Sequence, residues 1–168
     1  MCLNDCNAIA TKLNQKLMEE MVSNTNFYPN VGLGDLLFRY DQNEVLSILG
    51  LPEEKEIDQV NDSDYTVRFF YKALGYSFHF HYEDNAFNYS SIHSKRIILD
   101  NEDFSMITKE RIIGVIKDYY LKKDLAYDEK YSFDESVNEE TYSFDNIGLT
   151  IWFENNRISD ICVNAVLP

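Results

Sequence analysis

The sequence has only three cysteines, Cys2, Cys6 and Cys162, and no run of about 18 apolar residues. An odd set of cysteines without metal-ligand spacing indicates neither a disulfide framework nor a structural zinc site. The missing apolar run predicts that no helix crosses a membrane. The first residues, with Asp5 early and no basic segment before an apolar one, differ from a secretory signal. We therefore expect reduced thiols and a cytoplasmic location.

Familiar catalytic motifs are also missing. The sequence contains no Gly-x-Ser-x-Gly, no Walker loop, no dinucleotide-binding glycine pattern and no His-Glu-x-x-His. The glycine pair Gly32 and Gly34 precedes a predicted helix, but it lacks the lysine and the spacing that phosphate binding requires. These absences favour a binding protein over an enzyme, with no cofactor and no metal.

Basic residues are scarce. The chain has 15 Lys and Arg against 29 Asp and Glu, which gives a formal charge of −14. Such a charge repels nucleic-acid phosphates and anionic membranes, and it attracts basic surfaces over about 10 Å at moderate salt. We expect a basic protein partner, with no direct nucleic-acid or membrane binding. The alternative is that the charge only maintains solubility.

Aromatic residues are abundant, with 12 Tyr and 11 Phe among 168 residues. This content predicts a folded protein rather than a disordered acidic chain. Residues 3–22 carry apolar side chains three or four positions apart, which predicts an amphipathic helix. We assign residues 1–30 to this N-terminal helical segment.

The next part of the chain predicts a capped helix followed by strands. Asp41 with Glu44 forms a capping-box pattern for a helix over 41–49, and Gly50 ends it. After an acidic connection, strands are predicted at 66–71 and at 75–83, and aromatic and polar residues alternate in the second of these. A polar stretch over 84–94 is expected to lead into a third strand at 96–99.

The same order then restarts. Thr108 is expected to cap a helix over 108–120, and an acidic connection follows it. Strands are predicted at 141–144, 148–154 and 158–166, the last two joined by a turn at Asn155-Asn156. The predicted repeats cover residues 31–104 and 105–168.

The predicted fold class is α+β. We expect antiparallel sheet, covered on one face by helices and built from two related halves, each a helix plus a β-meander. Gly75 matches Gly148 in this alignment, and His79 matches Trp152. The residues predicted to be buried against the helices are Phe78, Phe80, Ile151 and Phe153.

The segment over 34–52 resembles the opening of an SmpA/OmlA-type domain, with Leu49, Gly50 and Pro52 as the matching residues. In tandem, such domains resemble the β-lactamase-inhibitor-protein fold. The resemblance implies a sheet with one helix-covered face and one concave face that grips a partner protein. It also implies that the chain is a bacterial toxin-immunity protein.

Two acidic clusters of −7 each, over 41–64 and 124–145, hold equivalent places in the halves. Together with polar and aromatic positions on the sheet, they give the predicted partner-binding residues: Glu53, Glu54, Glu56, Asp58, His79, His81, Asp134, Glu135, Glu139, Glu140, Trp152 and Glu154. Trp152 is expected to point out from the sheet, unless another element covers it.

The favoured hypothesis is an acidic inhibitor that occludes the cleft of a basic enzyme, such as a nuclease toxin. One alternative is a metal-dependent enzyme that uses His79 and His81, because alternate residues of a strand share a face. Another alternative is a nucleic-acid mimic that blocks a host defence protein.

Overall fold

The computed structural model describes residues 24–166. The helix predicted at 3–22, and with it most of the segment assigned to 1–30, lies outside the described residues. Residues 24–30 contain the short strand β1 (Phe27–Tyr28), which pairs with β2 (Gly32–Leu33). β3 (Leu36–Leu37) completes this small sheet.

An antiparallel sheet of eight strands dominates the fold, in the order β10-β11-β12-β13-β7-β6-β5-β4. Its first half is made of β4 (Glu54–Gln59), β5 (Tyr65–Tyr71), β6 (Tyr76–Glu83) and β7 (Ala86–Ser94). Its second half is made of β10 (Glu129–Asp134), β11 (Glu139–Phe144), β12 (Leu149–Glu154) and β13 (Arg157–Asn164). The chain is therefore α+β, as the sequence predicted.

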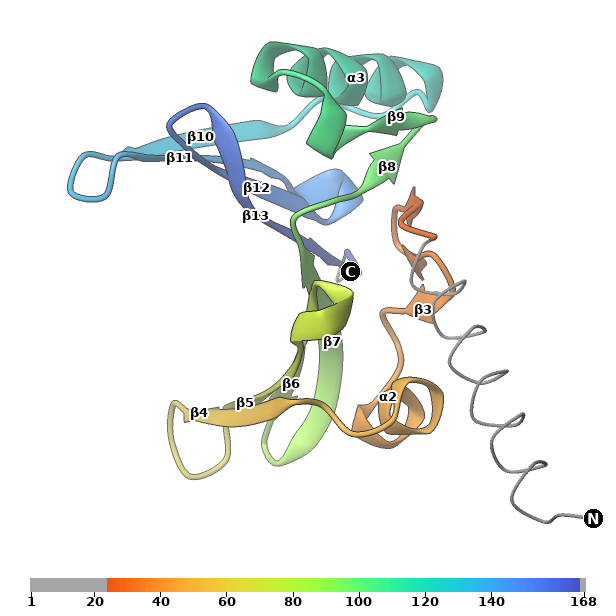
Figure 1. The fold of residues 1–168 in the computed structure, drawn as a ribbon, viewed down its shortest axis with the longest axis vertical. Helices are drawn as coiled ribbons and strands as arrows, with labels where there is room; N and C mark the ends of the chain where they lie inside the picture. The colour runs from red at the N-terminus through yellow and green to blue at the C-terminus, as the bar shows by residue number, and fades with distance from the viewer. Residues whose placement is uncertain (1–23, 167–168) are drawn as a thin grey trace, which may run out of the picture.

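The large sheet is strongly bent, so that its two halves form the arms of a C in Figure 1. The helices α2 (Gln42–Leu49) and α3 (Lys109–Lys122) lie on the outside of the bend. The small sheet and the pair β8 (Ile98–Leu99) and β9 (Glu102–Asp103) lie on that side as well. The inner side of the C carries no helix within residues 24–166.

Local sequence signals account for both helices. Asp41 accepts hydrogen bonds from the amides of Asn43 and Glu44, and the Glu44 carboxylate accepts from the amide of Asp41. This capping box satisfies amides that have no partner within the helix. Thr108 caps α3 in the same way, through the amide of Arg111.

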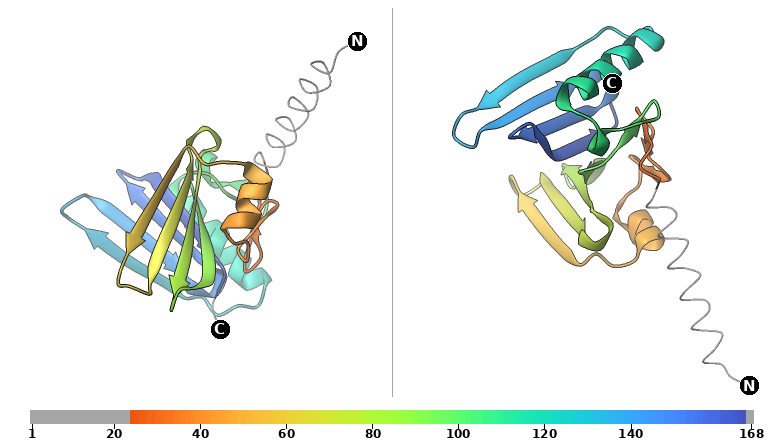
Figure 2. Two further views of the ribbon diagram at one scale, coloured as in Figure 1. Left: turned by 90° about the horizontal axis from the view of Figure 1, so that it is seen from below. Right: turned by 45° about the horizontal axis from the view of Figure 1, so that its top comes forward.

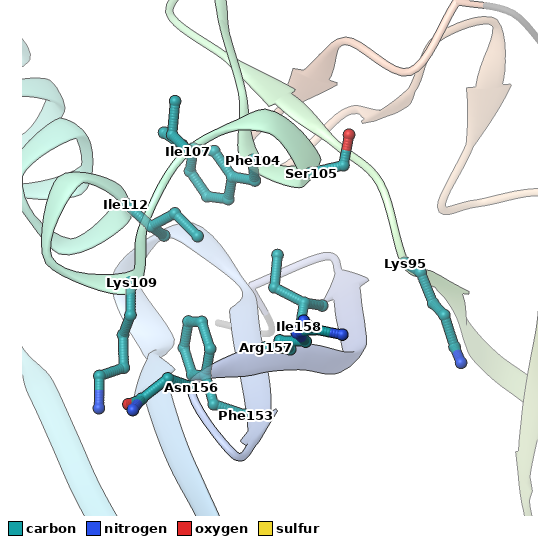
Figure 3. Close-up of a pocket in the computed structure, with 10 residues that line it drawn as sticks. All are labelled: Lys95, Phe104, Ser105, Ile107, Lys109, Ile112, Phe153, Asn156, Arg157 and Ile158. Atoms are coloured by element: carbon teal, nitrogen blue, oxygen red, sulfur yellow. The ribbon is translucent and has the colours of Figure 1, made fainter.

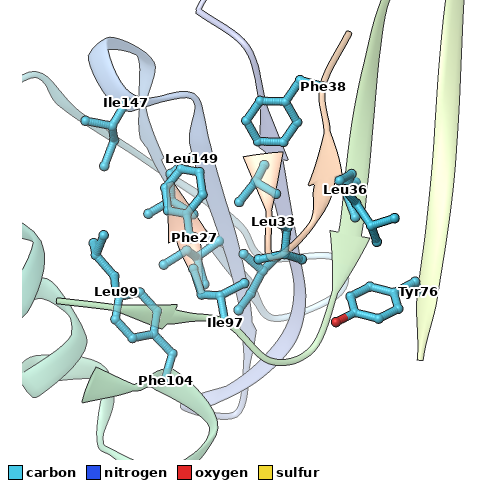
Figure 4. Close-up of a cluster of buried hydrophobic side chains, with 14 of the residues drawn as sticks. Phe27, Leu33, Leu36, Phe38, Tyr76, Ile97, Leu99, Phe104, Ile147 and Leu149 are labelled. Atoms are coloured by element: carbon cyan, nitrogen blue, oxygen red, sulfur yellow. The ribbon is translucent and has the colours of Figure 1, made fainter. Parts of the chain in front are cut away.

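The core lies between the large sheet and the elements outside the bend. Phe78, Phe80, Ile151 and Phe153 are all at most 1% exposed, which confirms that this face of the sheet is buried. Figure 4 shows how the small sheet and the segment around Ile97 fill the space behind the bend. The apolar face of α3 belongs to the same cluster.

The two halves repeat the same order of elements. Each runs from a helix through a hairpin, a short 3-10 turn and a second hairpin, with η1 (Lys72–Leu74) before Gly75 and η3 (Asp145–Ile147) before Gly148. Both glycines have the left-handed conformation, at φ 73° and 63°. The last strands of the halves, β7 and β13, pair antiparallel with His93 opposite Cys162. The halves are therefore related by an approximate two-fold axis near this pair.

Two parts of the sequence-based strand prediction are wrong. The regions read as acidic connections contain β4 and β10, the two edge strands of the sheet, in which every residue is exposed. Such strands bury no apolar face, so they lack the alternation that identifies a half-buried strand. The third strand of the first half is β7, within the supposed polar stretch, while only residues 98–99 of the predicted strand are paired, with β9.

Candidate functional site

The side of the large sheet opposite Phe78 and Ile151, here called the inner face, lines the inside of the bend. Strand register decides which residues lie on it, because successive side chains alternate between the two sides. His79 pairs with Arg68 on β5 and with Ser91 on β7, so all three lie on the inner face. Trp152 pairs with Asp160 on β13, which places both on the same face in the second half.

A row of rings crosses the middle of the inner face. The ring of His79 stacks on that of His93 with centroids 4.0 Å apart, and Phe70 meets His79 edge-on at 6.5 Å. On the other side, His93 stacks on Trp152 at 6.3 Å. The row thus joins the two halves across the β7–β13 junction. Trp152 is half-buried within it.

His93 is held in place by Asp160. Its Nδ1 lies 2.7 Å from Asp160 Oδ2, and its side chain is 18% exposed. Burial alone would lower the pKa of His93, but hydrogen bonds to Asp160 and Cys162 raise this pKa to about 9. His93 is therefore a cation at neutral pH, bound to a carboxylate at the centre of the face.

The two histidines predicted from the sequence are held differently. His79 contacts Ser77 Oγ at 3.2 Å through Nε2, and burial followed by the charge of His93 lowers its pKa to about 3. His81 contacts Thr66 Oγ1 at 3.1 Å and stacks on Tyr89 at 4.4 Å. Burial is also the main reason that the pKa of His81 is lowered. Both rings are neutral at pH 7 and act as hydrogen-bonding aromatic groups.

These contacts do not assemble a metal centre. Within residues 24–166, no group of three histidine, cysteine or carboxylate side chains is arranged to hold a metal ion. Instead, His79 Nε2 contacts the hydroxyl of Ser77, and the two ring nitrogens of His81 contact the hydroxyls of Thr66 and Ser91. The geometry gives the metal-dependent alternative no support.

Carboxylates border the row of rings on both sides. On β4, register places Glu54, Glu56 and Asp58 on the inner face, opposite Phe70, Arg68 and Thr66. At the other end of the sheet, the inner face carries Asp134, Glu139 and Glu154. Most of these carboxylates are open to solvent. The three on β4 are exposed as well, but each lies close to a basic side chain: Arg68 pairs with Asp58 and, at 3.8 Å, with Glu56, and Lys72 pairs with Glu54.

Three predicted site residues have other roles. Glu53 accepts hydrogen bonds from the amides of Lys72 and Ala73 and so closes the 3-10 turn, which lowers its pKa. Glu140 lies on the helix-covered side, where its carboxylate is 2.7 Å from Lys109 Nζ. Glu135 lies in the turn between β10 and β11. The structure thus gathers nine of the twelve predicted residues on the inner face and separates these three from it.

Sequence reasoning missed Arg68, Tyr89, His93 and Asp160 on the inner face. The extra residue of a β-bulge interrupts the alternation in β7 between the partners of His81 and Tyr82. A second irregularity in β13 does the same near Asp160. Each bulge shifts the alternation of side chains by one residue within its strand. The sequence alone does not show where this shift occurs, so it does not show which residues share a face.

Among the described residues, no helix combines the length and apolar character required to cross a membrane. In comparisons with known proteins, no family model matches the chain, and neither curated proteins nor solved structures give a match. The resemblance to SmpA/OmlA-type domains therefore remains a prediction.

Proposed function

We propose that this chain is an acidic inhibitor that binds a basic protein on the inner face of its bent sheet. The observation that carries the proposal is the arrangement of this face, with a continuous row of rings at its centre and carboxylates at both ends. Rings in a partly desolvated row suit the central anchors of an interface, and charges suit its rim. Within residues 24–166 no helix lies on the inside of the bend, and the curvature of the sheet suits a convex partner (Figure 2).

The charges favour a basic partner. Glu54, Glu56 and Asp58 at one end and Asp134, Glu139 and Glu154 at the other surround the row with negative potential. Such a field accelerates association with a positive surface and weakens as salt screens it. Enzymes that act on nucleic acid have positive clefts, so occlusion of such a cleft would inhibit them. We propose a nuclease toxin as the target and immunity in the bacterial cytoplasm as the role.

The histidines support binding rather than catalysis. A general base requires a free nitrogen near its reactant, and a pKa close to the working pH. His79 is shifted far below neutrality, and His93 is shifted above it and bound to Asp160. The rings therefore offer a rigid surface more than a proton relay.

The test begins with affinity capture from the source cells, followed by measurement of association and dissociation rates with the captured protein. We expect association to slow as salt rises. Neutralising Glu54, Glu56 and Asp58 together should slow association with less effect on dissociation. A matched control variant neutralises three carboxylates on the outer side instead, those of Glu110, Asp118 and Asp124.

Trp152→Ala should act on the other rate. If Trp152 anchors the partner, its removal should speed dissociation by a factor that corresponds to roughly 2 kcal/mol or more. The captured protein should be basic, and the wild-type chain should inhibit its enzymatic activity. The proposal would be contradicted if the association rate did not change with salt concentration and the dissociation rate of the Trp152→Ala variant equalled that of the wild type. Capture of an acidic partner, or binding without inhibition, would also contradict it.

A further inference from the structure

A pocket of about 310 Å³ lies between the start of α3 and the end of the β12–β13 hairpin. Figure 3 shows its side chains. The apolar ones come from two sides, with Phe104, Ile107 and Ile112 opposite Phe153 and Ile158. We call this space the α3 pocket.

The first half of the molecule closes the equivalent space. There β6 has 8 residues where β12 has 6, so the β6–β7 hairpin reaches further along the helix. Its Tyr82 accepts a hydrogen bond from Gln42 Nε2 at 2.7 Å, and Phe87 packs against the Tyr82 ring. Gln42 is the first residue of α2, as Lys109 is of α3. In the second half the shorter hairpin borders the α3 pocket instead.

The rim of the α3 pocket is basic. It carries Lys95, Lys109 and Arg157, although the chain as a whole is at −14. Lys109 is paired with Glu140, but among the described residues neither Lys95 nor Arg157 pairs with a carboxylate. Arg157 forms no ion pair even with Glu154, which lies opposite it in the β12–β13 hairpin.

We propose that the α3 pocket binds a carboxylate attached to a compact apolar group. Ile107 and Ile158, the half-buried apolar side chains of the pocket, would contact the group, and Arg157 with Lys95 would bind the carboxylate at the rim. Liquid water occupies about 30 Å³ per molecule, so 310 Å³ has room for roughly ten non-hydrogen atoms. A medium-chain fatty acid and the C-terminal residue of an apolar peptide share this chemistry and size. The site adjoins the inner face, because Arg157 lies opposite Glu154 at the end of the β12–β13 hairpin. The proposal does not rest on the function proposed for the inner face.

The probes are octanoate for the fatty acid and N-acetyl-leucine for the peptide C-terminus, with octanamide as a neutral analogue of octanoate. Each is titrated into the full chain labelled at the isoleucine methyl groups, and NMR follows Ile107, Ile112 and Ile158. We expect saturable shifts at these three methyls with at least one of the two carboxylates. Octanamide should bind at least tenfold more weakly than octanoate. A response to octanoate alone identifies the fatty acid as the source, and a response to N-acetyl-leucine identifies the peptide terminus.

The double variant Lys95→Gln with Arg157→Gln should weaken binding of the responding carboxylate at least tenfold. The control variant Lys117→Gln with Lys123→Gln makes the same change in net charge on the exposed side of α3 and should leave binding unchanged. Both pairs are exposed, so the spectra of both variants should match that of the folded wild type. Absence of shifts with both carboxylates would overturn the proposal. So would equal binding of octanamide and octanoate, or equal binding of wild type and the Lys95/Arg157 variant.

Discussion

From the contact between His93 and Asp160 we predict how the free energy of unfolding changes with pH. The pKa of His93 is about 9 in the folded chain and about 6.5 in an unfolded one. Because the folded pKa is the higher, the stabilisation is fully present below pH 6.5 and is lost as pH rises through 9. A difference of about 2.5 pKa units corresponds to about 3 kcal/mol. Asp160 is 39% exposed, and solvent screening reduces this to about 2 kcal/mol.

The change that tests this contact is Asp160→Asn, which keeps the shape of the side chain and removes its charge. Urea unfolding of both proteins at pH 6 and pH 9 measures the free energies. The wild type should lose about 2 kcal/mol more than the variant between these pH values. Other groups that titrate near pH 9 are the same in both proteins, so their contributions to the free energy of unfolding cancel in the comparison. An NMR titration should place the pKa of His93 well above 6.5 in the wild type and lower in Asp160→Asn. Equal pH profiles, or a wild-type His93 that titrates at 6.5 or below, would refute the reasoning.

Three further predictions concern the rest of the sheet. His79 has a pKa of about 3, so between pH 7.5 and pH 5 the unfolded chain binds a proton at this residue and the folded chain does not. The contribution of His79 should therefore lower the free energy of unfolding by about 2 kcal/mol over this range, against the opposite contribution of His93, and His79→Gln should reduce this loss in urea unfolding. Phe80→Ala should cost about 3–5 kcal/mol in the same assay, while Phe133→Ala, at a side chain that is 47% exposed, should cost far less; similar costs would contradict the assigned core. Gly148→Ala should destabilise more than Gly75→Ala, because both have positive φ but only the Cβ at 148 would lie 2.0 Å from a backbone carbonyl oxygen of β13; thermal melts of the two variants give the order.

Local patterns in the sequence were sufficient for the two described helices and for β5, β6, β11, β12 and β13, but not for β7. The capping box at Asp41, the alternation around Phe78 and Phe80 and the turn at Asn155-Asn156 all appear in the structure. These signals work because each depends on neighbours within a few residues, such as a free amide, a pleat or a left-handed turn. The repeated order of a helix followed by strands was predicted from the same patterns, without β4 and β10.

The edge strands and the composition of the inner face depended on tertiary structure. β4 and β10 are strands because a neighbouring strand offers backbone partners, and their own side chains bury nothing that would give a period-2 pattern. His93 and Asp160 are far apart in the sequence, and only the antiparallel pairing of β7 with β13 brings them to 2.7 Å. The sequence by itself therefore determined the elements and the charge. The fold decided which charges and rings meet, because register and bulges determine the side of the sheet on which each residue lies.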